Sequence, residues 1–392
     1  MQSLEVITLP SGRQNSMRHI QMTIVALLVF ACSQDPDVPR TDFTEIDTEA
    51  QRLMSGEEVK GLAIAVIGDA RPVHIATFGY RNVERALPLE KNTVMYGASF
   101  TKTAFAYMLL QLVDEDRFDL DRPLHEYLRK AIPSYDDYAD LAGDDRWQLL
   151  TARHVLTHST GFANFRWLED DRKLRFHFTP GDRYAYSGEG FYLLQFTLEE
   201  GLGLDVKKEM QTRVFDRFGM SNTSMQWRAD FADNLADGYA MDGSFEPHDQ
   251  RSNVSAAGSM DTTIADQALM WAGIMRGEGL SDEARAELVR PQLAITTAHQ
   301  FPTLWDTSDP RGPGIGLSAG LGLVTFGEGS SKGWFKGGHD DWTGNIAVCQ
   351  EASRNCVILL SNSVRAELIY PELVTYVLGE SGMPWWWEYN HN

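Results

Sequence analysis

The segment "NTVMYGASFTKTAFAYMLLQLVDEDRFDLDRPLHEYL", residues 92–128, combines a long amphipathic pattern with a serine that stands three positions before a lysine. From Ser99 onward, apolar residues occupy positions 100, 104, 105, 108, 109, 112 and 113, which is the spacing of a helix with a wide buried stripe. The pattern predicts a helix over residues 99–116 whose apolar stripe is buried.

Ser99 and Lys102 would share the first turn of this helix. Backbone N–H groups are unpaired there and the helix dipole favours an anion. Lys102 projects from the same face as Ser99, and a lysine in a partly desolvated site can have its pKa lowered and accept the serine proton. The pair is a candidate nucleophile and base, while a helix cap beside a solvated lysine is the alternative for the tetrapeptide alone.

Strand patterns lie on both sides of the predicted helix. Residues 61–68, "GLAIAVIG", and 73–84, "VHIATFGYRNVE", are separated by a short turn, so the sheet begins antiparallel. Further strands are expected at 321–327, 333–338, 344–349 and 356–363, and further helices at 44–58, 256–277 and 365–379.

Strands at both ends with helices between them predict an α/β (α+β) fold, an antiparallel sheet flanked by helices with an inserted, mainly helical domain. The expected α/β domain comprises residues 44–98 and 251–380, and the helical domain that carries the nucleophile comprises 99–250. Residues 381–392 are expected to be a C-terminal tail.

The N-terminus predicts export. A basic pair, Arg18 and His19, precedes the apolar run "MTIVALLVFAC", which is too short to span a bilayer and has the length of a signal-peptide core. Residues 1–32 are therefore expected to be a signal segment and 33–43 a linker. The run ends in a loose lipobox at Cys32, so the protein is expected to be periplasmic, or a membrane-anchored lipoprotein with lipid on Cys32. Plain secretion is the alternative.

The charge and the remaining cysteines narrow the interpretation further. A net charge of −20 argues against nucleic acid or an anionic membrane surface as a partner.

Cys349 and Cys356 bracket "QEASRN" between two strand patterns, so a hairpin would bring them within disulfide distance. An exported chain makes that bond plausible; two free buried cysteines are the alternative.

The segment 92–128 resembles the region around the active-site serine of class C β-lactamases, penicillin-binding proteins and the related serine hydrolases and esterases. The resemblance continues, in the order found in that family, through "LTARHVLTHSTGF" (150–162), "PGDRYAYSGEGFYLLQ" (180–195), "FGMSNT" (218–223) and "AAGSMDTTIAD" (256–266). It covers residues from about 60 to 363. It implies a β-lactamase/transpeptidase-like fold and an acyl-enzyme on Ser99, with no cofactor and no metal.

The second motif of the family is Tyr-x-Asn or Ser-x-Asn, and Tyr186-Ser187-Gly188 occupies its place. The resemblance implies that Tyr186 is the base or proton relay between Ser99 and the leaving group, with Ser187 beside the substrate. Gly188 departs from the motif, because no amide side chain is available to contact Lys102 or a substrate amide. This departure argues against efficient β-lactam turnover; a merely packed aromatic is the alternative for Tyr186.

The third motif, Lys-Thr-Gly or His-x-Gly, has two possible registers in "WFKGGHDDWTGN". Side chains three apart on a regular strand face opposite sides, so Lys336 and His339 are expected not to point into one cleft together. Lys336 is favoured, since Gly338 then supplies the final glycine that lets substrate approach the backbone. In this register the N–H groups of Ser99 and His339 would form the oxyanion hole. Lys336 would orient a substrate carboxylate or tune Tyr186.

Two competing sites are weaker. "GLSAG", residues 316–320, matches the nucleophile elbow of α/β-hydrolases but lacks a buried strand before it and a helix after it. His154 and His158 could share a helix face as metal ligands, yet Val155 stands where the metalloprotease motif has Glu. These histidines are expected to cap or pack the loop before "STGF".

The sequence therefore predicts a secreted or lipid-anchored serine hydrolase that acts on a small-molecule or peptide substrate through an amide, ester or lactam carbonyl. Small esters and D-amino-acid peptides rank above β-lactams because of Gly188. The alternative is a non-catalytic protein that binds cell-wall peptides and retains the fold.

Overall fold

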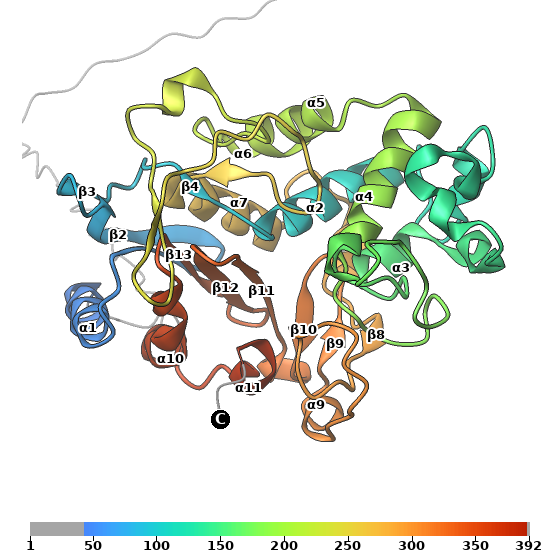
Figure 1. Cartoon of the computed structure of the whole chain (residues 1–392). Coiled ribbons are helices and arrows are strands. Elements are labelled where there is room, and N and C mark those ends of the chain that lie inside the picture. Colours follow the sequence, from blue (N-terminus) through green and yellow to red (C-terminus); the bar gives the residue numbers. More distant parts are fainter. Residues whose placement is uncertain (1–42, 390–392) are drawn as a thin grey trace, which may run out of the picture. The chain divides into compact units, whose positions relative to one another are not determined.

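A nine-stranded antiparallel sheet forms the centre of the fold in the computed structural model, which describes residues 43–389 (Figure 1). The strand order is β3-β2-β1-β13-β12-β11-β10-β9-β8. The strands are β1 (Gly61–Gly68), β2 (Arg71–Asn82), β3 (Leu87–Pro88), β8 (Leu293–Ala294), β9 (Ser318–Ala319), β10 (Val324–Phe326), β11 (Gly333–His339), β12 (Gly344–Gln350) and β13 (Asn355–Ser361). The sheet joins strands from both ends of the chain, as predicted, because β1 pairs with β13.

Helices cover both faces of this sheet. One face carries α2 (Phe100–Asp114), α7 (Ile264–Arg276) and α8 (Asp282–Leu288), and the other carries α1 (Phe43–Gly56), α10 (Tyr370–Leu378) and α11 (Trp385–Glu388) (Figure 1). Along β1, Ala63 and Ala65 belong to the first core, whereas Leu62 and Ile64 belong to the second. All eight residues of β1 are buried, which explains why its sequence is a continuous apolar run.

Helix α2 is buried on every side. Each residue from Phe100 to Leu112 is buried, so the expectation of a single buried stripe is wrong. The reason is that α2 lies between the sheet and an outer layer of helical segments, and a helix enclosed in this way is apolar all round (Figure 1). The helix that begins after Ser99 is thus enclosed at the centre of the fold.

The outer segments are mainly short helices and loops. They include α3 (Ala152–Leu156), α4 (Gly188–Phe196), α5 (Val206–Met210) and α6 (Asp216–Phe218), while α9 (Arg311–Gly314) lies near β8 and β9. Two small ribbons accompany them, β4–β7 (Met95–Tyr96 with Asp261–Thr262) and β5–β6 (Gly238–Tyr239 with Phe245–Glu246). The described residues belong to one compact unit, and the division at residues 99 and 250 stays a prediction.

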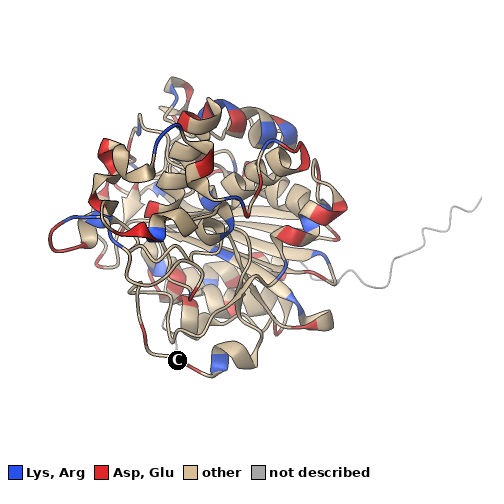
Figure 2. Ribbon diagram, turned by 90° about the vertical axis from the view of Figure 1, so that its right-hand side faces the viewer, with Lys and Arg blue, Asp and Glu red and all other residues tan. Residues whose placement is uncertain are grey.

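Acidic and basic residues are interspersed along the ribbon (Figure 2). Local ion pairs result, as where Arg213 contacts both Glu115, at the end of α2, and Glu209 in α5. Such partly exposed pairs contribute little each. The stability of the fold therefore rests on the two cores on either side of the sheet.

The two cysteines lie directly opposite each other in the β12–β13 hairpin, and a disulfide joins Cys349 to Cys356. Residues 381–389 do not extend away as a tail, because α11 packs on the sheet with Trp387 fully buried. The expected signal segment, almost all of the expected linker, and Cys32 lie outside the described residues. Within residues 43–389, no helix combines the length and apolar character that crossing a bilayer requires.

Candidate active site

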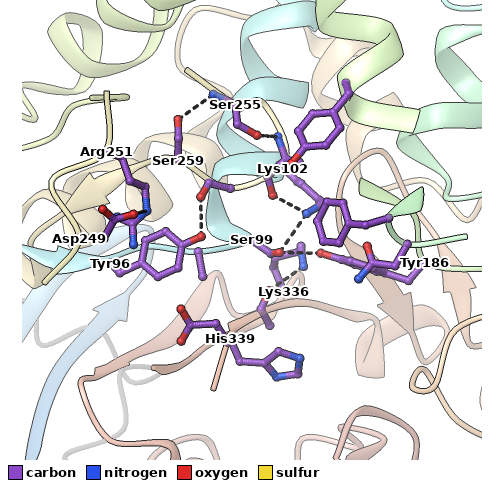
Figure 3. Close-up of a pocket in the computed structure, with 18 of the residues that line it drawn as sticks. Tyr96, Ser99, Lys102, Tyr186, Asp249, Arg251, Ser255, Ser259, Lys336 and His339 are labelled. Carbon is purple, nitrogen blue, oxygen red and sulfur yellow. Dashed lines mark hydrogen bonds and ion pairs between the residues drawn. The ribbon is translucent and has the colours of Figure 1, made fainter. Parts of the chain in front are cut away.

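A cavity of about 600 Å³ lies where the N-terminus of α2 meets the end of β11 (Figure 3). One side, which we call the helical wall, is formed by Ser99, Lys102, Tyr186 and Phe165. The opposite side, the strand wall, is formed by Lys336, Gly337, His339 and Glu388. The cavity gathers residues that are more than 280 positions apart in the chain.

A sharp turn places Ser99 at the tip of α2. The preceding residue, Ala98, adopts a left-handed backbone with φ of 46°, which costs energy for a residue with a Cβ and redirects the chain from β4 into the helix. Ser99 occupies the N-cap position, but its hydroxyl makes no capping hydrogen bond. That hydroxyl instead faces Lys102 and Tyr186 (Figure 3).

Lys102 is almost completely buried, with 1% of its surface exposed. Its Nζ lies 3.0 Å from Ser99 Oγ and donates to the carbonyl oxygen of Ala257 at 2.5 Å. Burial, together with the charge of Lys336, holds the pKa of Lys102 well below its usual range. The lowered pKa favours the unprotonated amine, the form that can accept the proton of Ser99.

Tyr186 completes the helical wall. Its hydroxyl donates to Ser99 Oγ at 2.7 Å, and burial raises the pKa of Tyr186, so the phenol keeps its proton. Of the two roles expected for Tyr186, these conditions favour a proton relay, with Lys102 as the base. The ring stacks on His158, whose Nδ1 accepts a hydrogen bond from the N–H of Ser187. His158 thus packs against Tyr186 and holds the backbone of Ser187, whereas the sequence predicted that it caps or packs the loop before "STGF".

Ser187 does not face the substrate, so this part of the prediction is wrong. Its side chain is the N-cap of α4: Oγ accepts from the N–H of Gly190 and donates to the carbonyl of Ala163. A helix that begins at Gly188 needs such a cap, because its first N–H groups have no partner within the helix. The hydroxyl of Ser187 is therefore occupied by these two hydrogen bonds.

The missing side chain at Gly188 has a steric explanation. A Cβ at this position would lie 2.3 Å from Cε1 of Phe165, whose ring stacks on Trp167 at a centroid distance of 4.1 Å. Beside them, Asn164 lines the cavity, and its Oδ1 accepts a hydrogen bond from the N–H of Gly188. Sequence reasoning missed Phe165 and Asn164, although both directly follow the quoted "STGF" motif in "ANF".

On the strand wall, the second half of β11 has a free edge. Strand β10 pairs with β11 only as far as Phe335, so the residues from Lys336 to His339 pair with β12 alone. The N–H of Asp340 donates to Thr343 in the β11–β12 turn. Because successive residues of a strand point their backbone groups to alternate sides, the N–H and C=O groups of Gly337 and His339 face the free edge.

Gly338 has a different role from the one expected. A Cβ there would lie 3.0 Å from the carbonyl oxygen of Gly97 and 3.2 Å from the backbone nitrogen of Phe100. Gly338 therefore lets β11 approach the tip of α2, rather than letting substrate approach β11. The close approach places the free edge of β11 against the tip of α2, and the oxyanion hole of Ser99 and His339 stays a prediction.

Lys336 and His339 both line the cavity, so the prediction that they exclude each other is wrong. Strand alternation itself holds: Trp334 on the Lys336 face belongs to the core of α2, and Phe335 on the His339 face belongs to the core of α10. The cavity reaches both faces because it lies at the end and free edge of the strand. His339 Nδ1 lies 3.2 Å from Oε1 of Glu367.

Glu388 was not foreseen from the sequence. It is 4% exposed and receives a hydrogen bond of 2.6 Å from Nε2 of Gln300, whose Oε1 in turn accepts from the hydroxyl of Tyr184. The only signal was the run of tryptophans in "MPWWWEYN", which indicates burial of the C-terminus but not the direction of the carboxylate.

The competing sites do not form comparable arrangements. Ser318 is a buried residue of β9 whose hydroxyl donates to the carbonyl of Gly316. His154 takes part in the capping box of α3 with Thr151. Among residues 43–389, no group of three or more His, Cys, Asp or Glu side chains is arranged to hold a metal ion.

The site combines a serine at a helix tip, a buried lysine one turn later, a tyrosine just before α4 and a free strand edge opposite, which is the arrangement of a serine hydrolase. The chain belongs to the Beta-lactamase family, whose model matches residues 46–372. Members of this family are serine hydrolases.

The named relatives are distant from this chain in sequence. The chain is 25% identical over 277 residues to an unguisins hydrolase of Aspergillus violaceofuscus, covering 62% of this chain and 47% of that protein. It is 22% identical over 211 residues to a β-lactamase of Escherichia coli (51% and 53% covered). It is 27% identical over 172 residues to a D-aminopeptidase of Gluconobacter oxydans (41% and 31%). The chain thus spans about half the length, or less, of these relatives.

Solved structures share the fold. An octameric penicillin-binding protein homologue from Pyrococcus abyssi superposes with a TM-score of 0.67 at 20% identity, covering 86% of this chain and 76% of that one. The D-alanine carboxypeptidase AmpC from Burkholderia cenocepacia gives 0.66 at 17% identity, covering 86% and 98%. The predicted β-lactamase/transpeptidase-like fold is confirmed.

Proposed function

We propose that this protein hydrolyses esters or peptide amides through a covalent acyl-enzyme on Ser99. The observation that carries the proposal is the position of Ser99 Oγ, 3.0 Å from the buried amine of Lys102 and 2.7 Å from the hydroxyl of Tyr186, at the bottom of an open cavity. A hydroxyl that makes no capping hydrogen bond and contacts a buried amine of lowered pKa is placed to act as the nucleophile.

The reaction follows from these contacts. Ser99 Oγ attacks the substrate carbonyl carbon while its proton passes to Lys102 Nζ, and the carbonyl oxygen becomes an anion that the N–H groups of Ser99 and His339 bind. The proton then moves through the hydroxyl of Tyr186 to the leaving oxygen or nitrogen, and the acyl group remains on Ser99. Water repeats the sequence in the second half and restores the serine.

The substrate class follows from the region around Gly188. An aromatic ring occupies the space into which a side chain at position 188 would project, so the helical wall offers an apolar surface there. This favours esters and D-amino-acid peptides over β-lactams. The D-aminopeptidase and the unguisins hydrolase among the relatives support a search among peptide substrates.

The N-terminal sequence and the Cys349–Cys356 disulfide support a further part of the proposal, that the protein is exported, with or without lipid on Cys32. The basic and acidic groups that line the cavity fit a small-molecule or peptide substrate. The alternative of a non-catalytic binding protein is disfavoured because the three reacting groups are in contact.

A fluorophosphonate probe tests the acyl-enzyme. Wild type is expected to gain the mass of one phosphonyl group, Ser99→Ala none, and Ser187→Ala the same mass as wild type, because Ser187 caps α4. Equal labelling of wild type and Ser99→Ala contradicts the assignment. Hydrolysis of p-nitrophenyl butyrate, D-alanine p-nitroanilide and nitrocefin then ranks the substrates, and fastest turnover of nitrocefin would overturn the preference.

A further inference from the structure

Two buried lysines share the cavity. Lys102 Nζ lies 4.9 Å and Lys336 Nζ 5.2 Å from the centre of the same ring, that of Tyr186. Two ammonium groups beside one ring in a buried site repel each other, and the charge of Lys336 contributes to the lowered pKa of Lys102. The chemistry needs Lys102 without its proton, so the site needs a reason for the proton to reside on Lys336.

Helix α11 supplies a carboxylate, that of Glu388, which lines the same cavity as Lys336. Glu388 packs against the backbone of Gly337, so closely that a Cβ on this glycine would lie 2.0 Å from Oε1. On the other side, Lys336 Nζ donates to the carbonyl oxygen of Gly337 at 2.6 Å. The carboxylate and the ammonium therefore lie against the same residue of β11.

Several contacts hold Glu388 in this position. Gln300 donates to Oε2 of Glu388 through its side chain, and its backbone N–H donates to the carbonyl of Trp387. Trp387 is fully buried and donates through Nε1 to Thr297. The placement is thus built into the packing of the C-terminal segment.

Glu388 is also the one acidic residue, among the described residues, that lines the small void of about 10 Å³ beside Lys336. The titratable groups that face Lys336 are Lys102 from α2, His158, Tyr184 and Tyr186 from the segments around α3 and α4, His339 from β11 with Glu367 behind it, and Glu388. Burial holds His158 neutral and keeps both tyrosines protonated.

We propose that Glu388 is a positioning residue that assigns the single proton of the lysine pair to Lys336 and so keeps Lys102 free to act as the base. The proposal rests on the proposed function, because it concerns the same acylation step. Burial lowers the pKa of Lys336 to about 8, and Glu388 opposes that shift. With the carboxylate in place, Lys336 is charged at neutral pH and its field disfavours a proton on Lys102.

The test is the pH profile of the second-order rate constant for labelling by a fluorophosphonate, measured with the full chain. In wild type the alkaline limb is expected near pH 8, where Lys336 loses its proton. Glu388→Gln keeps the shape and the hydrogen bond with Gln300 but removes the charge, so the limb should move by about one pH unit to lower pH. Glu388→Asp keeps the negative charge and should leave the limb close to its wild-type position.

Glu367→Gln is the matched control. It removes a partly buried carboxylate from the same side of β11, but that carboxylate contacts His339 and not Lys336. Its alkaline limb is expected to coincide with that of wild type. A Glu388→Gln profile that superimposes on wild type, or an equal shift in Glu367→Gln, would overturn the proposal.

If Glu388→Gln does not fold, as judged by its thermal transition, Gln300→Leu serves instead. It releases the carboxylate without removing it and should move the limb in the same direction by a smaller amount; an unchanged limb counts against the proposal. Failure of the proposed function has a different signature: wild type would then show no labelling of Ser99 at any pH.

Discussion

The helical wall and the strand wall of the cavity each hold one buried lysine, in opposite electrostatic settings. Lys102 has an alcohol and a backbone carbonyl as partners, and its pKa falls well below the usual range. Lys336 has the carboxylate of Glu388 on the far side of Gly337, and its pKa falls only to about 8. The same side chain thus has its pKa lowered strongly on one wall and less on the other, because its neighbours differ.

In the proposed reaction, this contrast divides the work between the two walls as follows. The helical wall removes and relays a proton, which requires a neutral amine and a protonated phenol in contact with Ser99. The strand wall binds charge as it develops on the substrate, which requires a cation and backbone N–H groups at a free edge. Each of the following experiments changes one wall and measures whether the other responds as expected.

The largest effect is expected on activity. Lys102→Ala removes the base and should lower kcat/KM for an ester about 10³-fold. Lys336→Ala removes only a favourable charge and should lower it about 10-fold. The substrate should be a neutral ester, p-nitrophenyl butyrate, so that binding of a substrate carboxylate does not contribute. Equal losses in the two variants would contradict the division of roles.

Replacement of each lysine by methionine should change stability in opposite directions. Lys102→Met removes an amine whose charged form the buried site disfavours. It should raise the free energy of unfolding at pH 7 by about 1 to 2 kcal/mol. Lys336→Met leaves Glu388 buried without its cation and should lower it by about 1 to 3 kcal/mol. Urea unfolding measures both, and changes of the same sign would remove the contrast.

The pH dependence of stability tests the sign of the Lys102→Met effect independently. The folded pKa of Lys102 is lowered, so between that pKa and 10.5 the unfolded chain binds one more proton than the folded chain. Stability therefore rises with pH over this interval. Lys102→Met should lose that rise, and its advantage over wild type should shrink as the pH approaches 10.5.

A smaller effect is expected at the apolar part of the helical wall. Gly188→Asn forces a side chain into the ring of Phe165 and should cost about 1 to 3 kcal/mol of stability. In the Phe165→Ala background the same substitution should cost much less, since the ring is gone. A thermodynamic cycle over the four proteins measures the coupling, and additive costs would show that the ring is not the obstacle.

The smallest effect concerns the two serines at helix N-termini. Ser187→Ala removes the cap of α4 and should cost about 1 kcal/mol of stability, with ester turnover near that of wild type. Ser99→Ala removes no capping bond and should leave stability nearly unchanged while abolishing turnover. Thermal unfolding and ester hydrolysis of both variants separate the roles; a large loss of activity in Ser187→Ala would contradict them.

Much of the fold followed from local patterns. The helix at Ser99, the strands of β1, β2 and β11–β13 and the hairpin of Cys349 and Cys356 lie where the sequence predicted them. The grouping of Ser99, Lys102 and Tyr186 came from motifs rather than from periodicity. Their catalytic roles stay predictions until the variants are measured.

The errors share one cause. Ser187, Gly338 and His339 were judged from their place in a motif or from strand alternation, but their roles depend on what packs against them. A cap for α4, the approach of β11 to α2, and the end of pairing with β10 are contacts between segments distant in the chain.

The sequence by itself determined most elements of this protein, because periodicity, caps and turn residues act over a few positions, and its motifs named the candidate reacting groups. Only the tertiary structure decided which lysine has its pKa lowered more strongly, which glycine lines the cavity and which acid lies behind β11. Charge states and open space are set by all the atoms within a few ångströms, and at this site those atoms come from residues as far apart as Ser99 and Glu388.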